Sequence, residues 1–367
     1  MRRILFFLLI LNLFIPRVSA STQTAHEYIL MDMNTGRILD GKNYNNKMLI
    51  ASITKIMTCV LAIESNKLDE VVTVDDTILK SYGSGIYIEV GEKLKLKDLL
   101  YGLMLRSGND AALMISKYVS GSTDKFVEKM NEKAKEIGMT NTTFNNPSGL
   151  DETDEGNYST AYDMAILTKY AMQYKEYREI VKTKKYTLKT NKKTYIWKNK
   201  NKLLNYDYIT GGKTGYTEKA KRTLVSTATK DNMNFIVVTI KDSDDWNTHT
   251  SLYKYAFENY KPYMVLNKED YKIYDKTYKN NLYIKNNVYI PLKEGEPAKL
   301  KNKIMLNKVK KYKNKQLIGY NNIYLDNEII YKEPIYIKKE IKKNKKDKTI
   351  FDYIRSKIWL IIYLVYL

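Results

Sequence analysis

The chain has 367 residues, of which 62 are Lys or Arg and 41 are Asp or Glu, giving a formal net charge of +21 at pH 7. A hydrophobic content of 44% is that of a globular protein and excludes a fully disordered chain, while the length favours two domains over one. One cysteine and two histidines exclude an intramolecular disulfide, a cysteine-rich metal site and an iron–sulfur cluster.

Residues 1–20 have the pattern of a secretory signal peptide. Arg2 and Arg3 precede an apolar run over 4–15, and small residues end the segment at Ala20. The run is shorter than the ~20 residues that a membrane-spanning helix needs. We therefore expect cleavage after Ala20 and export, with an uncleaved anchor as the alternative.

The segment 21–262 mixes helix-period and strand-period patterns, taken here in chain order. We expect a hairpin over 26–43 that turns at 34–36, followed by a helix over 53–66. Next come two helices over 96–121 with a break at 106–109, an amphipathic helix over 124–138 and a helix over 160–174. Two strands over 223–241, with a turn at 231–232, end the segment. Strands at both ends and helices between them predict an α/β domain, a sheet with a helical middle.

The remaining sequence changes in composition near residue 262. Most of the prolines and +14 of the net charge lie in 261–367, and short alternating Tyr/Ile/Leu patterns over 263–350 predict a small all-β domain. The last 17 residues, 351–367, end in ten apolar residues that rise only ~15 Å as a helix. Beside the lysine-rich run 338–348, this tail predicts attachment to a membrane surface, with a buried terminal element as the alternative.

The first of three chemical motifs is S-x-x-K at Ser52 and Lys55. Residues three apart share one face of a helix, so the two side chains point into the same space. A serine hydroxyl becomes a good nucleophile only when a base takes its proton, and Lys55 is the only base within one helical turn of Ser52. Lys55 must then be neutral, so burial or a neighbouring cation such as Lys213 has to lower its pKa.

The second motif is S-x-N at Ser107 and Asn109, in the expected break between two helices. From there both side chains can face a cleft, Ser107 to relay a proton to a leaving amine and Asn109 to hold a substrate amide. Ordinary loop capping is the alternative for either residue taken alone.

The third motif is K-T-G at 213–215, followed by Tyr216 and Thr217, and it begins a strand pattern. We expect Lys213 on an edge strand beside the cleft, where a lysine and threonine suit a substrate carboxylate. The backbone N–H of Tyr216 would join that of Ser52 as an oxyanion hole. The three motifs in this order form a strong combined signal.

Together with the segments 51–58, 106–112, 145–151, 160–172 and 211–228, these motifs resemble the penicillin-binding D-alanyl-D-alanine carboxypeptidases, serine peptidases of bacterial cell walls with a β-lactamase/transpeptidase-like fold. The resemblance implies that Ser52 is the acylated nucleophile, Lys55 its general base and Ser107 the proton relay. It also implies that β-lactams inhibit by acylating the same serine. The expected substrate-binding residues are Asn109, Lys213, Thr214, Gly215, Tyr216 and Thr217.

Two other functions share parts of this pattern. A secreted serine β-lactamase needs a deacylating glutamate, typically in E-x-x-L-N, and no glutamate between 109 and 213 has an asparagine four residues on. A non-catalytic wall-binding protein would be expected to have lost a motif residue, and none is lost. The resemblance implies that the substrates are peptidoglycan stem peptides, from which the terminal D-Ala is removed.

No cofactor or metal is expected. The aspartate-rich segment 242–249 lacks the glycine and the closing glutamate of a calcium loop, and is expected to cap a helix beginning near Thr250. The basic carboxyl-terminal third carries no nucleic-acid motif, so anionic wall polymers and lipids are the expected partners of its charge. The expected location is the outer face of the cytoplasmic membrane or the cell wall.

Overall fold

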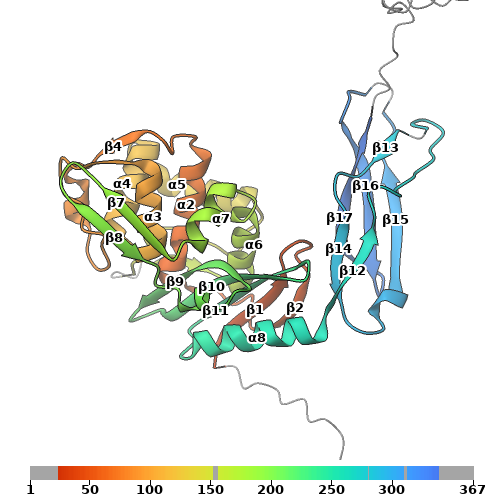
Figure 1. Ribbon diagram of the computed structural model, residues 1–367, viewed down its shortest axis with the longest axis horizontal. Helices are drawn as coiled ribbons and strands as arrows, with labels where there is room; N and C mark the ends of the chain where they lie inside the picture. Colours follow the sequence, from red (N-terminus) through yellow and green to blue (C-terminus); the bar gives the residue numbers. More distant parts are fainter. Residues whose placement is uncertain (1–23, 152–155, 280, 310–311, 339–367) are drawn as a thin grey trace, which may run out of the picture. The chain divides into compact units, whose positions relative to one another are not determined.

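The computed structural model describes residues 24–151, 156–279, 281–309 and 312–338 (Figure 1). They form two compact units. Unit 1 consists of the described residues of Met1–Tyr263 and Tyr289–Lys299. Unit 2 consists of the described residues of Met264–Val288 and Leu300–Leu367. The predicted signal peptide, the lysine-rich run beyond 338 and the apolar tail lie outside the described residues.

Unit 1 contains an antiparallel five-stranded sheet with two covered faces. Its strands are β1 (Glu27–Asp32), β2 (Ile38–Lys42), β9 (Ile209–Thr217), β10 (Lys221–Lys230) and β11 (Met233–Ile240), in the order β2-β1-β11-β10-β9. All six residues of β1 are buried, because alternate side chains enter two different cores. Ile29 and Met31 join the core of the helical middle, while Tyr28 and Leu30 join the second core on the opposite face.

The helical middle packs on one face of this sheet and a single long helix on the other (Figure 1). The helices and helical turns are η2 (Ala51–Thr54), α2 (Lys55–Glu64), η3 (Asp76–Lys80), α3 (Leu96–Tyr101), η4 (Gly102–Arg106), α4 (Asn109–Ser120), α5 (Thr123–Glu136), α6 (Ala161–Ala171), α7 (Lys175–Lys182), η5 (Lys202–Asn205), α8 (Asp245–Asn259) and η6 (Glu296–Lys299). Nine of the ten residues of α2 are buried, as expected for a helix surrounded by protein on all sides. Cys59 on α2 is a buried core residue with no accessible surface.

The elements expected from the sequence are present in unit 1. The first hairpin, the helix break near 107 and the β10–β11 hairpin are confirmed, and β9 is an edge strand as predicted. The predicted start of the last helix is wrong, because α8 begins at Asp245 rather than near Thr250. Asp245 instead pairs with Arg222 at 2.6 Å, which holds the first turn of α8 against β10.

Three two-stranded pairs in unit 1 were not expected from the sequence. They are β3 (Met48–Leu49) with β6 (Tyr158–Ser159), β4 (Val71–Thr73) with β5 (Lys93–Lys95) and β7 (Lys185–Lys189) with β8 (Thr194–Lys198). Each is short or has exposed residues on one side, so the hydrophobic pattern is weak. Each pair connects two segments of the chain around the helical middle through backbone hydrogen bonds.

Residues 289–299 return to unit 1, which a single boundary near 262 does not anticipate. Arg37, after the first turn, forms a two-point ion pair with Glu296 at 2.5 and 3.1 Å and also donates to Pro291 O at 3.2 Å. Lys293 donates to Tyr255 Oη on α8 at 2.9 Å. Partly buried, bidentate pairs of this kind hold a segment more firmly than exposed ones.

Unit 2 is all β among its described residues, as predicted. Its sheet is β13 (Leu282–Tyr283), β17 (Glu328–Ile337), β16 (Leu317–Leu325) and β15 (Leu300–Leu306), in that order. The strands β12 (Lys261–Leu266) and β14 (Val288–Leu292) pair with each other, and the residues of each are divided between the two units. Alternate residues of β16 and β17 are buried, including Ile323 and Ile335. Within the described residues, no helix is both long and apolar enough to cross a membrane.

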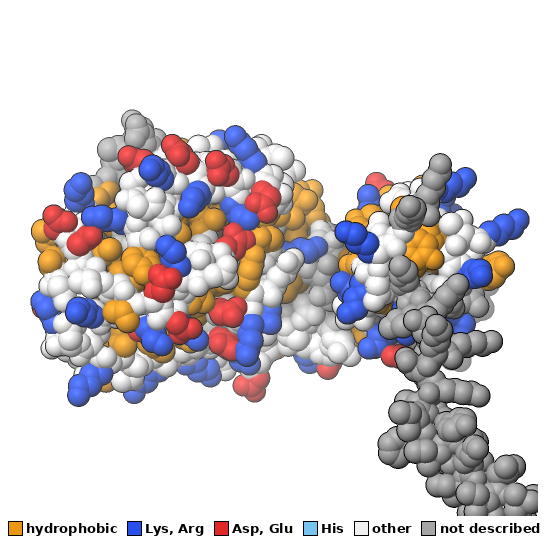
Figure 2. Space-filling view, turned by 90° about the horizontal axis from the view of Figure 1, so that it is seen from above, with side chains coloured by type: hydrophobic (Ala, Val, Ile, Leu, Met, Phe, Trp, Pro, Cys, Tyr) orange, Lys and Arg blue, Asp and Glu red, His pale blue; other side chains and the backbone are white. Residues whose placement is uncertain are grey.

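The excess of basic residues is not confined to one area of the surface. Figure 2 shows lysine and arginine side chains spread over the visible surface, with aspartates and glutamates among them. Net charge alone therefore does not mark a binding face, and a site has to be located from its geometry.

Candidate active site

The structure brings Ser52 and Lys55 together at the start of the buried helix α2. Ser52 lies in the tight turn η2, and Lys55 begins α2 one turn later. Lys55 Nζ donates to Ser52 Oγ at 3.0 Å. The expected pairing of hydroxyl and amine is therefore present.

The Lys55 amine is fully buried and held by oxygen acceptors from three segments. Besides Ser52, it donates to Asn109 Oδ1 at 2.7 Å and to the Ser148 carbonyl oxygen at 2.6 Å. Burial lowers the pKa of Lys55 well below its usual 10.5, and the positive charges of Lys213 and Lys200 lower it further. A lysine in this setting can lose its proton and act as a base.

Ser107 and Asn109 occupy the break between η4 and α4. Ser107 takes a left-handed backbone conformation at φ +66°, unusual for a residue other than glycine, and so turns the chain from one helix to the next. Asn109 N donates to Ser84 O and Asn109 Nδ2 donates to Tyr82 O, both at 2.7 Å. With its Oδ1 on Lys55, the Asn109 amide is fixed in orientation.

Lys213 forms a second lysine–serine pair across the same site. It lies on the edge strand β9, is almost fully buried, and donates to Ser107 Oγ at 3.1 Å and to Thr214 O at 2.6 Å. Burial, and then the charge of Lys200, lower the pKa of Lys213 to about 7. The two lysines thus join Ser107, Asn109 and the partly exposed Ser52 into one cluster.

The end of β9 runs past the backbone of Ser52. A Cβ added to Gly215 would lie 2.9 Å from Ser52 N, so only glycine allows this approach. Thr217 Oγ1 donates to Asp151 Oδ2 at 2.5 Å. The side chain of Tyr216 is 53% exposed and its hydroxyl donates to Glu218, so only its backbone is a candidate for the site.

Comparison with known proteins agrees with this geometry. A family model described as D-alanyl-D-alanine carboxypeptidase matches residues 16–244, and one described as penicillin-binding protein 5, C-terminal domain, matches 257–343. The chain belongs to the D-alanyl-D-alanine carboxypeptidase family. The resemblance noted in the sequence is confirmed.

Individual relatives cover nearly the whole chain. D-alanyl-D-alanine carboxypeptidase DacF of Bacillus subtilis is 34% identical over 350 residues, covering 89% of this chain and 88% of that protein. DacA of Escherichia coli is 29% identical over 360 residues, with coverage of 90% and 87%. The crystal structure of penicillin binding protein 5 from Haemophilus influenzae superposes with a TM-score of 0.71 at 26% identity, covering 88% and 99%. The β-lactamase and non-catalytic alternatives are not favoured by these matches.

The family motifs do not include several residues that shape the site. Lys200 acts on the pKa of both buried lysines. Asp110 acts in the opposite direction and raises the pKa of Lys55, and the Ser148 carbonyl oxygen accepts a hydrogen bond from the Lys55 amine. Lys200 belongs to an acid-free, lysine-rich stretch over 181–206, in which nothing distinguishes it from the neighbouring lysines.

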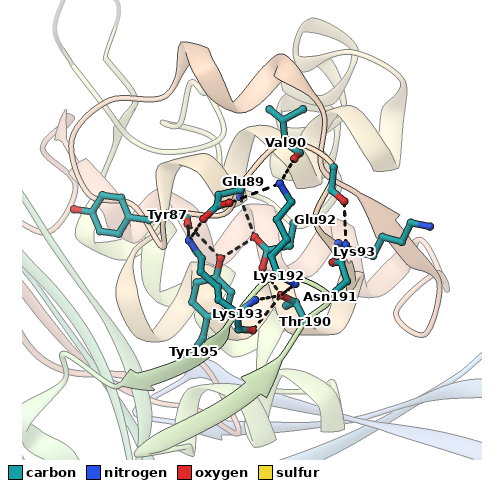
Figure 3. Close-up of polar contacts among 11 residues, drawn as sticks. Tyr87, Glu89, Val90, Glu92, Lys93, Thr190, Asn191, Lys192, Lys193 and Tyr195 are labelled. Atoms are coloured by element: carbon teal, nitrogen blue, oxygen red, sulfur yellow. Dashed lines mark hydrogen bonds and ion pairs between the residues drawn. The ribbon is translucent and has the colours of Figure 1, made fainter.

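The segment that positions Asn109 is itself anchored by two buried carboxylates. Asp110 accepts from the backbone N–H of Ile86 at 3.0 Å and of Tyr87 at 2.7 Å. Glu92, with no exposed surface, accepts from Thr190 and Tyr195 of the β7–β8 hairpin (Figure 3). The segment 82–92 is thereby tied both to α4 and to the hairpin.

A metal centre has no candidate in the described ranges. No group of three or more His, Cys, Asp or Glu side chains there is arranged to hold an ion. The chemistry derived below uses the side chains and backbone of the chain itself.

The influence of Lys200 is testable by pH dependence. Removing its charge in Lys200→Ala relieves repulsion, so the pKa of Lys55 rises and less of the amine is neutral at a given pH. The acid limb of the pH profile for acylation by penicillin should move upward by roughly 0.5 to 1 pH unit. Stopped-flow acylation across pH measures this, with the exposed Lys202→Ala as the matched control. Equal profiles for both variants would contradict the electrostatic role of Lys200.

Proposed function

We propose that the chain is a serine-type D-alanyl-D-alanine carboxypeptidase that removes the terminal D-Ala from peptidoglycan stem peptides through a Ser52 acyl-enzyme. The observation that carries this proposal is the buried amine of Lys55, 3.0 Å from Ser52 Oγ, with its pKa lowered by burial. Family membership supports the reaction. β-Lactams acylate the same serine and so inhibit the enzyme.

Acylation begins with proton transfer from Ser52 to neutral Lys55. Ser52 Oγ then attacks the carbonyl carbon of the penultimate D-Ala, and the carbonyl electron pair moves to oxygen. The backbone N–H groups of Ser52 and Tyr216 stabilise this oxyanion, an arrangement supported by the close approach of Gly215 to Ser52 N.

Collapse of the tetrahedral intermediate breaks the peptide bond. The leaving amine of the terminal D-Ala takes up the proton that Lys55 accepted from Ser52, relayed through Ser107, so that Lys55 is neutral again; Ser107 Oγ is held by the Lys213 amine. Water then attacks the ester with Lys55 as base, releasing the shortened peptide and restoring Ser52. Lys55 therefore serves both half-reactions.

The terminal carboxylate of the substrate is bound by the β9 side of the site. Lys213 supplies a positive charge there, with Thr214 and Thr217 beside it on the same strand. Asn109 contacts the substrate amide on the opposite side, although in the free protein its Oδ1 is engaged with Lys55. Because the pKa of Lys213 is about 7, binding a carboxylate would favour its charged form.

The identity of the nucleophile is tested by labelling. Incubation with a penicillin should add its mass to the peptide that contains Ser52, and Ser52→Ala should neither be labelled nor hydrolyse D-Ala-D-Ala peptides. Lys55→Met should lower acylation by at least about a thousandfold, since the two residues act as a unit. Intact-mass and peptide mapping measure both. Label on a peptide lacking Ser52 would refute the assignment.

The role of Lys213 is tested with matched substrates. Lys213→Ala should weaken kcat/KM for a peptide with a free carboxyl terminus by roughly 10- to 150-fold, the value of a charge-assisted hydrogen bond of ~1.5–3 kcal/mol. The amidated peptide should lose much less. Equal losses for the two peptides would show that Lys213 acts on Lys55 and not on the carboxylate.

We further propose that the protein is exported and held at the outer face of the cytoplasmic membrane. The signal-like pattern of residues 1–20 and the basic and apolar tail support this. Four inserted large apolar side chains would contribute ~6–12 kcal/mol before ordering costs, more than salt-screened lysines.

This proposal predicts which treatment releases the protein. Deleting residues 351–367 should yield soluble protein that still binds penicillin, whereas high salt should release little of the intact chain from membranes. Fractionation followed by penicillin labelling measures both. Release of the intact protein by salt alone would show that the lysine-rich run, and not the apolar tail, is the attachment.

A further inference from the structure

A groove of about 400 Å³ lies on the face of the five-stranded sheet that α8 covers (Figure 1). It is formed by the segment before β9, the end of β10 and the second half of α8, and we call it the Tyr206 groove. Two of its residues, Tyr208 and Phe257, pack against the second core. Lys213 lies opposite Val225, whose side chain joins the core of the helical middle. The groove and the catalytic cleft are therefore separate features on opposite faces of the sheet.

Three aromatic rings line the groove. The centroids of the Tyr206 and Tyr208 rings are 5.6 Å apart with an interplanar angle of 29°, and Tyr208 meets Phe257 edge-on at 5.6 Å. Tyr206 is 48% exposed, so its ring is open to a ligand. The faces of a sugar ring that carry only C–H groups pack well on flat apolar surfaces of this kind.

The rest of the described lining is polar and contains no aliphatic side chain. Its other members are Lys230, Thr250, Ser251, Lys254 and Glu258. The hydroxyl groups of Tyr206, Tyr208 and Ser251 have no hydrogen-bond partner within the described part of the chain. A site for a lipid chain or an apolar peptide would be lined by Leu, Ile, Val or Met. Aromatic rings combined with free hydroxyl groups instead suit an oligosaccharide.

One positive charge in the groove is uncompensated. Lys230 Nζ lies 5.7 Å from the centroid of the Phe257 ring, and no carboxylate among the described residues pairs with it. Lys254 and Glu258 pair with each other at 4.0 Å. An N-acetylated sugar brings both groups that this corner lacks, because its amide carbonyl accepts from Lys230 and its methyl group packs beside Phe257.

The aromatic lining is fixed in the free protein. Tyr208 packs edge-on against the buried Tyr253 at 6.0 Å, and Tyr253 Oη is hydrogen-bonded to Ser226 Oγ at 2.7 Å. The backbone N–H of Thr229 donates to Tyr208 O at 2.8 Å. A groove that is formed before binding does not have to be ordered by its ligand, which favours affinity.

We propose that the Tyr206 groove binds the glycan strand of peptidoglycan through its N-acetylated sugars. This inference rests on the proposed function, since the stem peptides are carried by that strand. The proposal does not require one stem peptide to bridge the groove and the cleft. A bound strand raises the concentration of all its stem peptides around the enzyme, which favours the polymer over free peptides as substrate.

Peptide-free glycan strands test the groove directly. Strands without stem peptides have nothing to react at Ser52, and prior acylation with penicillin blocks the cleft. Tyr206→Ala removes an exposed ring from the groove, and Tyr263→Ala, at a tyrosine that is 45% exposed and outside the groove, is the matched control. Calorimetry should show that Tyr206→Ala weakens glycan binding by roughly three- to tenfold and that Tyr263→Ala leaves it unchanged.

A charge reversal gives a second, independent measurement, and decides the question if Tyr206→Ala does not fold. Lys230→Glu replaces the donor to the amide carbonyl with an acceptor, so it should weaken glycan binding several-fold. Lys129→Glu, at an exposed lysine of α5, should not change it. Cello-oligosaccharides, which lack N-acetyl groups, should bind the wild-type protein several-fold more weakly than the wall glycan.

Activity separates the groove from the cleft. Both groove variants should release D-Ala more slowly from intact peptidoglycan, mainly through KM, with unchanged rates on a soluble pentapeptide and in penicillin acylation. No binding of peptide-free glycan by the wild-type protein, equal losses in groove and control variants, or equal affinity for cello-oligosaccharides would overturn the proposal. A wild-type protein that binds glycan but releases no D-Ala from any peptide would instead refute the proposed function.

Discussion

The withdrawal of the Lys55 amine from water is the constraint on which the rest of the site depends. A buried ammonium is costly unless oxygen atoms replace its hydration, and here they come from a turn, a helix start and a loop far apart in sequence. The loop approaches so closely that a Cβ on Gly149 would lie 1.9 Å from Ala51 O.

The same site stores backbone strain. Ser107, Ala51 and Tyr87 all have positive φ values, although none is glycine. Each such residue costs of order 1 kcal/mol or more and persists only where its surroundings over-determine it. Asp110 accepts from the backbone N–H of Tyr87, and the bonds of Asn109 hold the chain two residues after Ser107, so polar contacts provide part of that support. The geometry of the cleft is thus imposed by its neighbours and not by local preference.

Much of this arrangement could be predicted from the sequence, because the relevant signals are local. The three-residue spacing of Ser52 and Lys55 places their side chains on the same face of a helix. The strand pattern that begins at Lys213 predicts that this lysine lies on an edge strand of the sheet. The roles of the site residues stay predictions, since geometry alone does not test them. Lys200 and the Ser148 carbonyl were missed because long-range charge and backbone oxygens leave no mark in a motif. The start of α8 was misplaced because Asp245 is fixed by Arg222, a partner on another strand.

The return of residues 289–299 to unit 1 has a consequence for how the chain is made. Arg37 lies in the turn between β1 and β2, and its bidentate partner, Glu296, follows 259 positions later in the chain. A growing chain cannot complete this unit until that late segment has been synthesised and has left the ribosome. Until then, the Arg37 guanidinium in the first hairpin lacks its Glu296 partner. Shortening the gene at the apparent domain border would therefore remove Glu296 and leave Arg37 without this ion pair.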